Sequence, residues 1–220
     1  MIEAILFDLG GTLIKTASPH IILEKILAAH GIQSQPERIF KAYEESSLEI
    51  KPEEYLLPYE DFWRLFNGRI LRKIGVQDDG RLADAITTEW WDNADLSLYP
   101  DVRETLKEIR KLGLKTGIVT NGYSDDITEV LRRTYLDGQF EVLIGADSVG
   151  ARKPSPAIFL YATDKLRVYP SNVLFVGDDL KMDYNGAEKA GLKPLLIDRE
   201  GLVRASVRKV SSLREILNHI

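Results

Sequence analysis

Cysteine is absent from this chain of 220 residues. Its absence excludes disulfide bonds, thiol catalysis and zinc sites built on cysteine. Long apolar runs are missing too: no stretch approaches the roughly 18 residues that a membrane-spanning helix requires. The first residues also lack the basic segment and apolar run of a signal peptide. We therefore expect a cytoplasmic protein with no membrane partner.

Positive charge is not concentrated anywhere in the sequence. The 29 Lys and Arg residues are outnumbered by 34 Asp and Glu residues, and no basic stripe or tail is present. Nucleic acid is therefore not an expected partner, because binding it depends on clustered cations. The hydrophobic content of 44% is enough for a core, and the length suits one domain carrying an insertion. The sequence predicts no particular oligomeric state.

Short apolar runs alternate with amphipathic segments along most of the chain. This alternation predicts an α/β fold with a doubly wound, mostly parallel, Rossmann-like sheet. The expected strands are residues 4–7, 115–120, 140–144, 173–176 and 194–197, and the expected helices are residues 101–112, 124–135, 157–166, 184–190 and 213–219.

One interval breaks this rhythm. Roughly eighty residues separate the first strand from the helix that leads into the second, about tenfold more than an ordinary connection. Apolar positions at helical spacing predict helices within it at residues 21–29, 37–47, 59–74 and 81–92. A plain stack of connecting helices is one interpretation. We favour a helical cap at residues 16–95, inserted into a core of residues 1–15 and 96–220, with hinges near residues 13–18 and 93–100.

Asp8 ends the first apolar run and is followed by two glycines and Thr12. A carboxylate packs poorly at the end of a buried strand, but it is well suited to hold a phosphate or a metal ion. In an open parallel sheet, ligands bind beyond the carboxyl ends of the strands. Further ligand-binding residues are therefore expected at the ends of the other strands.

Three more polar elements fall at or after strand ends: residues 120–122, Lys153-Pro154, and residues 177–179 with Asp183. Each alone has an ordinary explanation as a helix cap, a solvated lysine or an acidic surface turn. Their order and placement together favour a shared site.

The chemistry of such a site is consistent. Asp8, Asp178 and Asp183 would converge at one sheet edge, where three carboxylates repel each other unless a cation lies among them. Oxygen ligands with room for water suit Mg²⁺. Lys153 would add fixed positive charge, and the Thr120 hydroxyl would donate to phosphate oxygens. Asp8 could then attack phosphorus to form an aspartyl-phosphate.

This ordered set resembles the motifs of the haloacid dehalogenase superfamily, specifically members with a helical cap after the first strand. The resemblance covers nearly the whole chain. Its four motifs correspond to FDLGGTL at residues 7–13, IVTNG at residues 118–122, RKPSPAIF at residues 152–159, and residues 176–191, which begin VGDD.

The resemblance assigns roles to individual residues. Asp8 would be the nucleophile and Lys153 its catalytic partner. Mg²⁺ would be held by Asp8, the Gly10 carbonyl, Asp178 and Asp183. The substrate, a small phosphorylated metabolite, would contact Lys153 and three residues of the strand-end turns: Gly11, Thr120 and Asn121.

Gly10 departs from the usual phosphatase pattern. Phosphatases of the superfamily usually carry a second Asp there, which protonates the leaving group, and such general acid–base help is worth roughly 10² to 10⁴ in rate. Three alternatives follow: a slow Mg²⁺-dependent phosphomonoester hydrolase, a phosphate-binding module with little turnover, and a 2-haloacid dehalogenase. The dehalogenase pattern lacks acids in its fourth motif, so Asp178 fits it poorly.

Overall fold

The computed structural model describes residues 1–220, which divide into two compact units. The core unit comprises Met1–Lys15 and Ser97–Ile220, and the helical unit comprises Thr16–Leu96. The second boundary lies one residue later than the sequence boundary, and the first coincides with it. Each unit is described by itself below.

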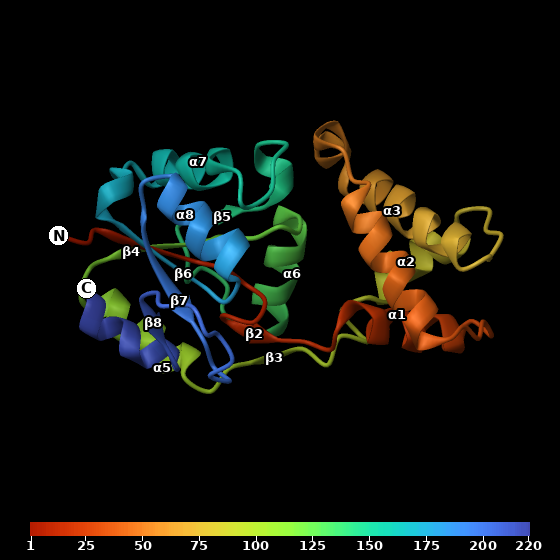
Figure 1. Ribbon diagram of the computed structural model, residues 1–220, viewed down its shortest axis with the longest axis horizontal. Helices are drawn as coiled ribbons and strands as arrows, with labels where there is room; N and C mark the ends of the chain where they lie inside the picture. Colours follow the sequence, from red (N-terminus) through yellow and green to blue (C-terminus); the bar gives the residue numbers. More distant parts are fainter. The chain divides into compact units, whose positions relative to one another are not determined.

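The core unit is built on a six-stranded sheet with the order β5-β4-β1-β6-β7-β8, in which every pairing is parallel (Figure 1). This arrangement confirms the predicted α/β class. The strands are β1 (Ala4–Phe7), β4 (Lys115–Val119), β5 (Val142–Ile144), β6 (Val173–Gly177), β7 (Lys193–Ile197) and β8 (Lys209–Val210).

Both faces of the central strand are covered, which explains why its sequence is apolar without alternation. All four residues of β1 are buried, and Leu6 pairs with Gly117 on one side and Phe175 on the other. Gly117 gives room to its neighbours, since a Cβ there would lie 2.3 Å from a methyl carbon of Val142. The sheet centre is therefore closely packed, and β1 ends between two neighbouring strand ends.

Helices cover the sheet on both sides, as expected of a doubly wound fold. α7 and α8 lie together on one face, where Phe159 and Ala187 join a buried cluster with strand residues, and α5 with η5 lies on the other (Figure 1). The core helices are α5 (Val102–Lys111), α6 (Ser124–Arg133), α7 (Pro156–Leu166) and α8 (Asn185–Lys189), with short helical turns η2 (Ala146–Ser148), η3 (Pro170–Asn172), η4 (Leu180–Tyr184) and η5 (Leu213–His219).

Two predicted helices differ from the structure. The helix expected at residues 184–190 is preceded by a π-helical turn, η4, and α8 itself is short. The segment expected to be α-helical at residues 213–219 is the 3₁₀ helix η5. Its first amide, Leu213 N–H, donates to Asp101 Oδ2 at 2.7 Å, so a tertiary contact shapes this helix start.

The two predicted hinge regions contain a pair of short strands that the sequence did not reveal. β2 (Ile14–Lys15) pairs antiparallel with β3 (Ser97–Leu98), and Tyr99 N–H donates to the Leu13 carbonyl at 3.1 Å. Two residues are too few to show a period, so sequence pattern could not predict them. Where the chain leaves and re-enters the core unit, its two segments are hydrogen-bonded to each other.

The helical unit is held by an aromatic core. Phe62 and Phe66 stack at 6.1 Å between ring centroids, and Tyr43 and Tyr55 pack against them. None of its helices, nor any in the core unit, is long and apolar enough to cross a membrane. The helices are α1 (Pro19–Ala29), α2 (Pro36–Leu48), η1 (Pro52–Leu56), α3 (Tyr59–Lys73) and α4 (Arg81–Glu89).

Candidate active site

The four sequence elements meet at the carboxyl edge of the sheet because β1 lies between β4 and β6. Asp8 follows β1, and its N–H donates to the Val176 carbonyl at 2.8 Å, which extends the β1–β6 pairing to the site. Thr120 follows β4, and Asp178 follows β6. Lys153 lies in the loop between η2 and α7.

Lys153 joins two of these elements. Its Nζ donates to Asp183 Oδ1 at 2.7 Å and to Asp8 Oδ1, and all three residues are buried. Burial alone would lower the pKa of this ammonium, but the attraction of Asp8 and Asp183 outweighs it and raises the pKa of Lys153. These two carboxylates therefore favour the charged form of Lys153.

The carboxylate cluster comprises Asp8, Asp178 and Asp183, whose oxygens come within 4.8 Å of one another. Burial raises the pKa of Asp8 to about 7, with Lys153 opposing the shift and the two neighbouring carboxylates adding to it. Desolvation of the carboxyl group and the nearby Asp183 charge raise the pKa of Asp178 to about 6. Both carboxyl groups therefore resist ionisation when no cation is bound.

This donor set fits a hard divalent metal ion. Three carboxylates against one ammonium leave two negative charges uncompensated, which a divalent cation would balance. The donors are all oxygen atoms, and Asp178 is exposed, so water can complete the coordination. The sequence prediction that Asp8, Asp178 and Asp183 come together therefore agrees with the geometry.

Two glycines make the close approach of these acids possible. A Cβ on Gly11 would lie 2.2 Å from Asp178 Oδ2, and Gly11 has a φ of +72°. A Cβ on Gly177 would lie 2.4 Å from Asp183 Cγ. The Gly11 N–H donates to the Ile14 carbonyl at 2.9 Å. Gly11 gives space to Asp178. Substrate binding by Gly11 stays a prediction.

Gly10 is different, because nothing in the structure requires a glycine there. It is exposed, its φ lies outside the positive region, and an added Cβ would meet no atom within 4 Å. A side chain at this position would have room. Packing around Gly10 therefore does not explain the missing acid.

Asn121 has a role that the sequence did not predict. Its Oδ1 accepts from the Lys153 N–H at 2.7 Å, and its Nδ2 donates to the Lys153 carbonyl at 3.4 Å. The amide thus holds the main chain of the residue that carries the ammonium. A separation of 32 residues gave no local signal for this contact. Substrate binding by Asn121 stays a prediction.

Thr120 and Asp179 complete the local picture. Thr120 is half-buried, its N–H donates to the Ile144 carbonyl at 2.9 Å, and its hydroxyl accepts a weak 3.4 Å bond from Gly122. That hydroxyl keeps its own proton available for a ligand. Asp179 instead caps η4, accepting from the N–H groups of Lys181 and Met182 at 2.7 Å each.

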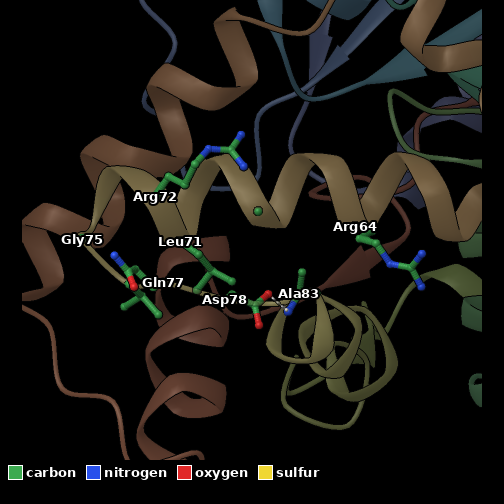
Figure 2. Close-up of a pocket in the computed structure, with 10 residues that line it drawn as sticks. Arg64, Leu71, Arg72, Gly75, Gln77, Asp78 and Ala83 are labelled. Carbon is green, nitrogen blue, oxygen red and sulfur yellow. Dashed lines mark hydrogen bonds between the residues drawn. The ribbon is translucent and has the colours of Figure 1, made fainter.

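A groove of about 690 Å³ lies within the helical unit, between α3 and the turn before α4 (Figure 2). Arg64 and Arg72 project from α3 there, but Arg64 is paired with Asp84 at 2.7 Å. At the start of α4, the N–H groups of Leu82 and Ala83 already donate to the Asp78 carboxylate, at 3.0 Å each. No anion site is formed at this helix end.

The core unit therefore carries three carboxylates and a lysine at the edge of a doubly wound sheet. Comparison with known proteins identifies the family that has this arrangement. A family model described as haloacid dehalogenase-like hydrolase matches residues 2–191. The chain belongs to the haloacid dehalogenase-like hydrolase family. This confirms the resemblance drawn from the four motifs and supports hydrolase activity.

Two similar proteins illustrate two different activities among the relatives of this hydrolase. It is 31% identical over 202 residues to a glyceraldehyde 3-phosphate phosphatase of Methanopyrus kandleri, covering 90% of this chain and 85% of that protein. It is 29% identical over 204 residues to (S)-2-haloacid dehalogenase 4A of Burkholderia cepacia, covering 91% and 84%. The crystal structure of a HAD phosphatase from Thermococcus onnurineus superposes with a TM-score of 0.74 at 28% identity, covering 99% and 97%.

Proposed function

We propose that this hydrolase is a Mg²⁺-dependent phosphatase of a small phosphorylated metabolite. The observation that carries the proposal is the carboxylate cluster, two of whose members, Asp8 and Asp183, pair with Lys153. When all three acids are ionised, their negative charge exceeds that of the single ammonium by two. Such a centre suits a divalent cation together with an anionic phosphoryl group. A reaction at an uncharged carbon–halogen bond has no need of three acids.

In the proposed reaction, Asp8 attacks phosphorus and the bond from phosphorus to the ester oxygen breaks. Lys153 offsets negative charge on the transferred group, and the Thr120 hydroxyl donates to one of its oxygens. Asp8, Asp178, Asp183 and the Gly10 carbonyl would hold Mg²⁺, which supplies charge neutralisation at the phosphoryl oxygens. Water then cleaves the aspartyl-phosphate and restores Asp8.

The absence of an acid at Gly10 is expected to limit the rate of this reaction. No side chain at that position can protonate the leaving oxygen or activate the attacking water. Phosphates with good leaving groups should therefore react faster than alkyl phosphates, and hydrolysis of the phospho-enzyme should be slow. The helical unit is proposed to act as a cap that selects the leaving group, as cap closure excludes water from such sites.

A 2-haloacid dehalogenase is the second candidate. It is favoured by the Burkholderia cepacia relative and by Gly10, which cannot act as the phosphatase acid. In that reaction Asp8 would attack carbon, halide would leave, and no metal would be needed. The acids Asp178 and Asp183 weigh against it, because a metal-free centre gains nothing from their repulsion.

The two candidates are separated by one pair of assays on the full chain. Phosphate release is measured from a panel of phosphorylated metabolites, including glyceraldehyde 3-phosphate, with Mg²⁺ and with excess chelator. Halide release is measured from 2-chloropropionate under both conditions. We expect phosphate release that requires Mg²⁺ and no halide. Chelator-resistant halide release without phosphatase activity would overturn the proposal in favour of the dehalogenase.

A further inference from the structure

Arg199 joins three separate segments of the core unit. It lies two residues past β7, and its guanidinium donates to both carboxylate oxygens of Asp101, at 2.9 and 3.2 Å. Its Nη2 also donates to the Thr12 carbonyl at 2.8 Å. The guanidinium carbon lies 3.7 Å from the centre of the Tyr99 ring. Only an arginine can make this bidentate, stacked arrangement.

The three segments are the one after β7 that carries Arg199, the loop after Asp8, and the stretch that follows the return strand β3. Thr12 lies two residues before β2, and Tyr99 follows β3 directly. Asp101 also accepts the Leu213 N–H at 2.7 Å, so the end of the chain is attached to the same carboxylate. Arg199 and Asp101 are mostly buried, with side-chain exposures of 15% and 17%.

The Thr12 carbonyl is the part of this network that reaches the active site. Residues 9–14 form a tight turn, in which Leu13 and Ile14 donate to the Leu9 carbonyl and Gly11 donates to Ile14. Gly11 in turn lies against Asp178. A turn closed this tightly transmits a shift at Thr12 to its neighbours Gly10 and Gly11. The hydrogen bond from Arg199 to the Thr12 carbonyl therefore influences the orientation of the Gly10 carbonyl.

Hydrogen bonding in this network is incomplete. Thr12 Oγ1 and Arg199 Nε are both buried without a partner, which costs free energy relative to a fully bonded arrangement. The hydrogen bonds that the guanidinium does make go to the Thr12 carbonyl and to the Asp101 carboxylate.

We propose that Arg199 is a positioning residue that holds the turn at residues 9–14 in its metal-binding shape through the Thr12 carbonyl. The inference rests on the proposed function, because it takes the Gly10 carbonyl as a Mg²⁺ ligand. Groups that orient metal ligands in this way typically change metal affinity by about 10- to 100-fold when they are lost. The hydrogen bonds of Arg199 go to Asp101 and Thr12, and not to the carboxylate cluster.

The test is Mg²⁺ binding by isothermal titration calorimetry on the wild-type protein, Arg199→Lys and Arg199→Gln. Lysine keeps the charge but cannot bond Asp101 and Thr12 with one planar fork, so its Mg²⁺ Kd should rise about tenfold. The glutamine variant should bind still more weakly. Phosphatase kcat in Arg199→Lys should recover to within about threefold of wild type at saturating Mg²⁺.

Arg103→Lys is the matched control. Arg103 also lies in the core unit and donates to two main-chain carbonyls, those of Thr134 and Tyr135, away from the turn. Its replacement should lower Tm without changing Mg²⁺ affinity. If Arg199→Gln does not fold, Arg199→Lys provides the test.

The outcomes separate this inference from the proposed function. A wild-type protein that binds no Mg²⁺, with Asp178→Ala behaving identically, would overturn both. Wild-type binding with Arg199→Lys within twofold of it would overturn only the positioning role, since a purely structural bridge lowers Tm and leaves Mg²⁺ affinity unchanged.

Discussion

The ion pairs at the centre of the core unit differ from an ion pair on the surface of the helical unit. In the core unit, Lys153 is buried between Asp8 and Asp183, with side-chain exposures of 3%, 10% and 3%. In the helical unit, Arg64 and Asp84 pair at the surface with exposures of 50% and 45%. The first arrangement is expensive to desolvate, and the second costs little.

Burying the charges of Lys153, Asp8 and Asp183 costs desolvation free energy, and this cost falls at the candidate active site. The crowded acids of the core have raised pKa values, so the fold holds them in a state that water would not favour. In the helical unit, the pair of Arg64 with Asp84 joins one cation to one carboxylate, without crowding of like charges. Even its best-shielded pair, Arg69 with Glu54, is a simple pairing that lowers the pKa of Glu54. The predictions below test this contrast.

The largest effect is expected from Asp8→Asn, which removes the nucleophile while preserving side-chain shape. Phosphatase activity should fall by at least about 10³-fold, as losing a covalent nucleophile usually costs several orders of magnitude. Steady-state kinetics with a nitrophenyl phosphate measures the loss, and circular dichroism checks the fold. Retention of more than about a tenth of the wild-type rate would contradict the covalent mechanism.

Asp178→Ala should weaken Mg²⁺ binding by roughly 10²-fold or more, because a direct ligand matters at least as much as the groups that orient one. Asp179→Ala is the adjacent control: its carboxylate caps η4 and does not belong to the cluster. Calorimetric titration compares the two variants. Equal Mg²⁺ affinity in Asp178→Ala and wild type would remove the metal site from the proposal.

Gly10→Asp should raise turnover of alkyl phosphates, by up to about 10²-fold, since it restores a general acid and base. An added Cβ at Gly10 would meet no atom within 4 Å, so the first side-chain atom has room. Rapid-quench measurement should detect accumulated phospho-enzyme in the wild type and less in the variant. A wild type that cleaves alkyl and aryl phosphates equally fast, with no phospho-enzyme, would show that another group supplies the proton.

Mg²⁺ affinity should increase as pH rises from 5 to 7.5 and then level off. Burial raises the pKa of Asp8 to about 7 and that of Asp178 to about 6, so below these values protons compete with the metal. Between pH 5 and 6 each proton displaced should change Kd by up to about tenfold per pH unit. Calorimetry in buffers of different ionisation enthalpy counts the released protons. Affinity that is constant across this range would contradict the raised pKa values.

The smallest effect is expected in the helical unit. Asp84→Asn removes the charge paired with Arg64, and exposed pairs of this kind contribute little to stability. Activity should stay within about twofold of wild type, and Tm should change by no more than about 2 °C. Differential scanning calorimetry and the phosphatase assay test both. A loss comparable to that in the Asp8 variant would abolish the contrast between the units.

Much of this protein follows from its sequence alone. The apolar runs that become β1 and β6 are buried on both faces, so their composition identifies them as central parallel strands. Asp8 and Asp178 follow these strands directly, and parallel strands bring their carboxyl ends to one edge. That geometric rule is why the meeting of Asp8 and Asp178 at one sheet edge could be predicted without coordinates.

Tertiary structure decided what depends on contacts between distant residues. β2 pairs with β3, and both strands are too short to show a period. The Asn121 amide contacts the Lys153 main chain across 32 residues of sequence, and Arg199 donates to the Thr12 carbonyl across 187 residues. Gly10 and Gly11 are adjacent glycines that the sequence cannot tell apart. A Cβ on Gly10 would meet no atom within 4 Å, whereas a Cβ on Gly11 would clash with Asp178. Periodicity and local propensity carry no information about such neighbours, because the chain path alone brings them together.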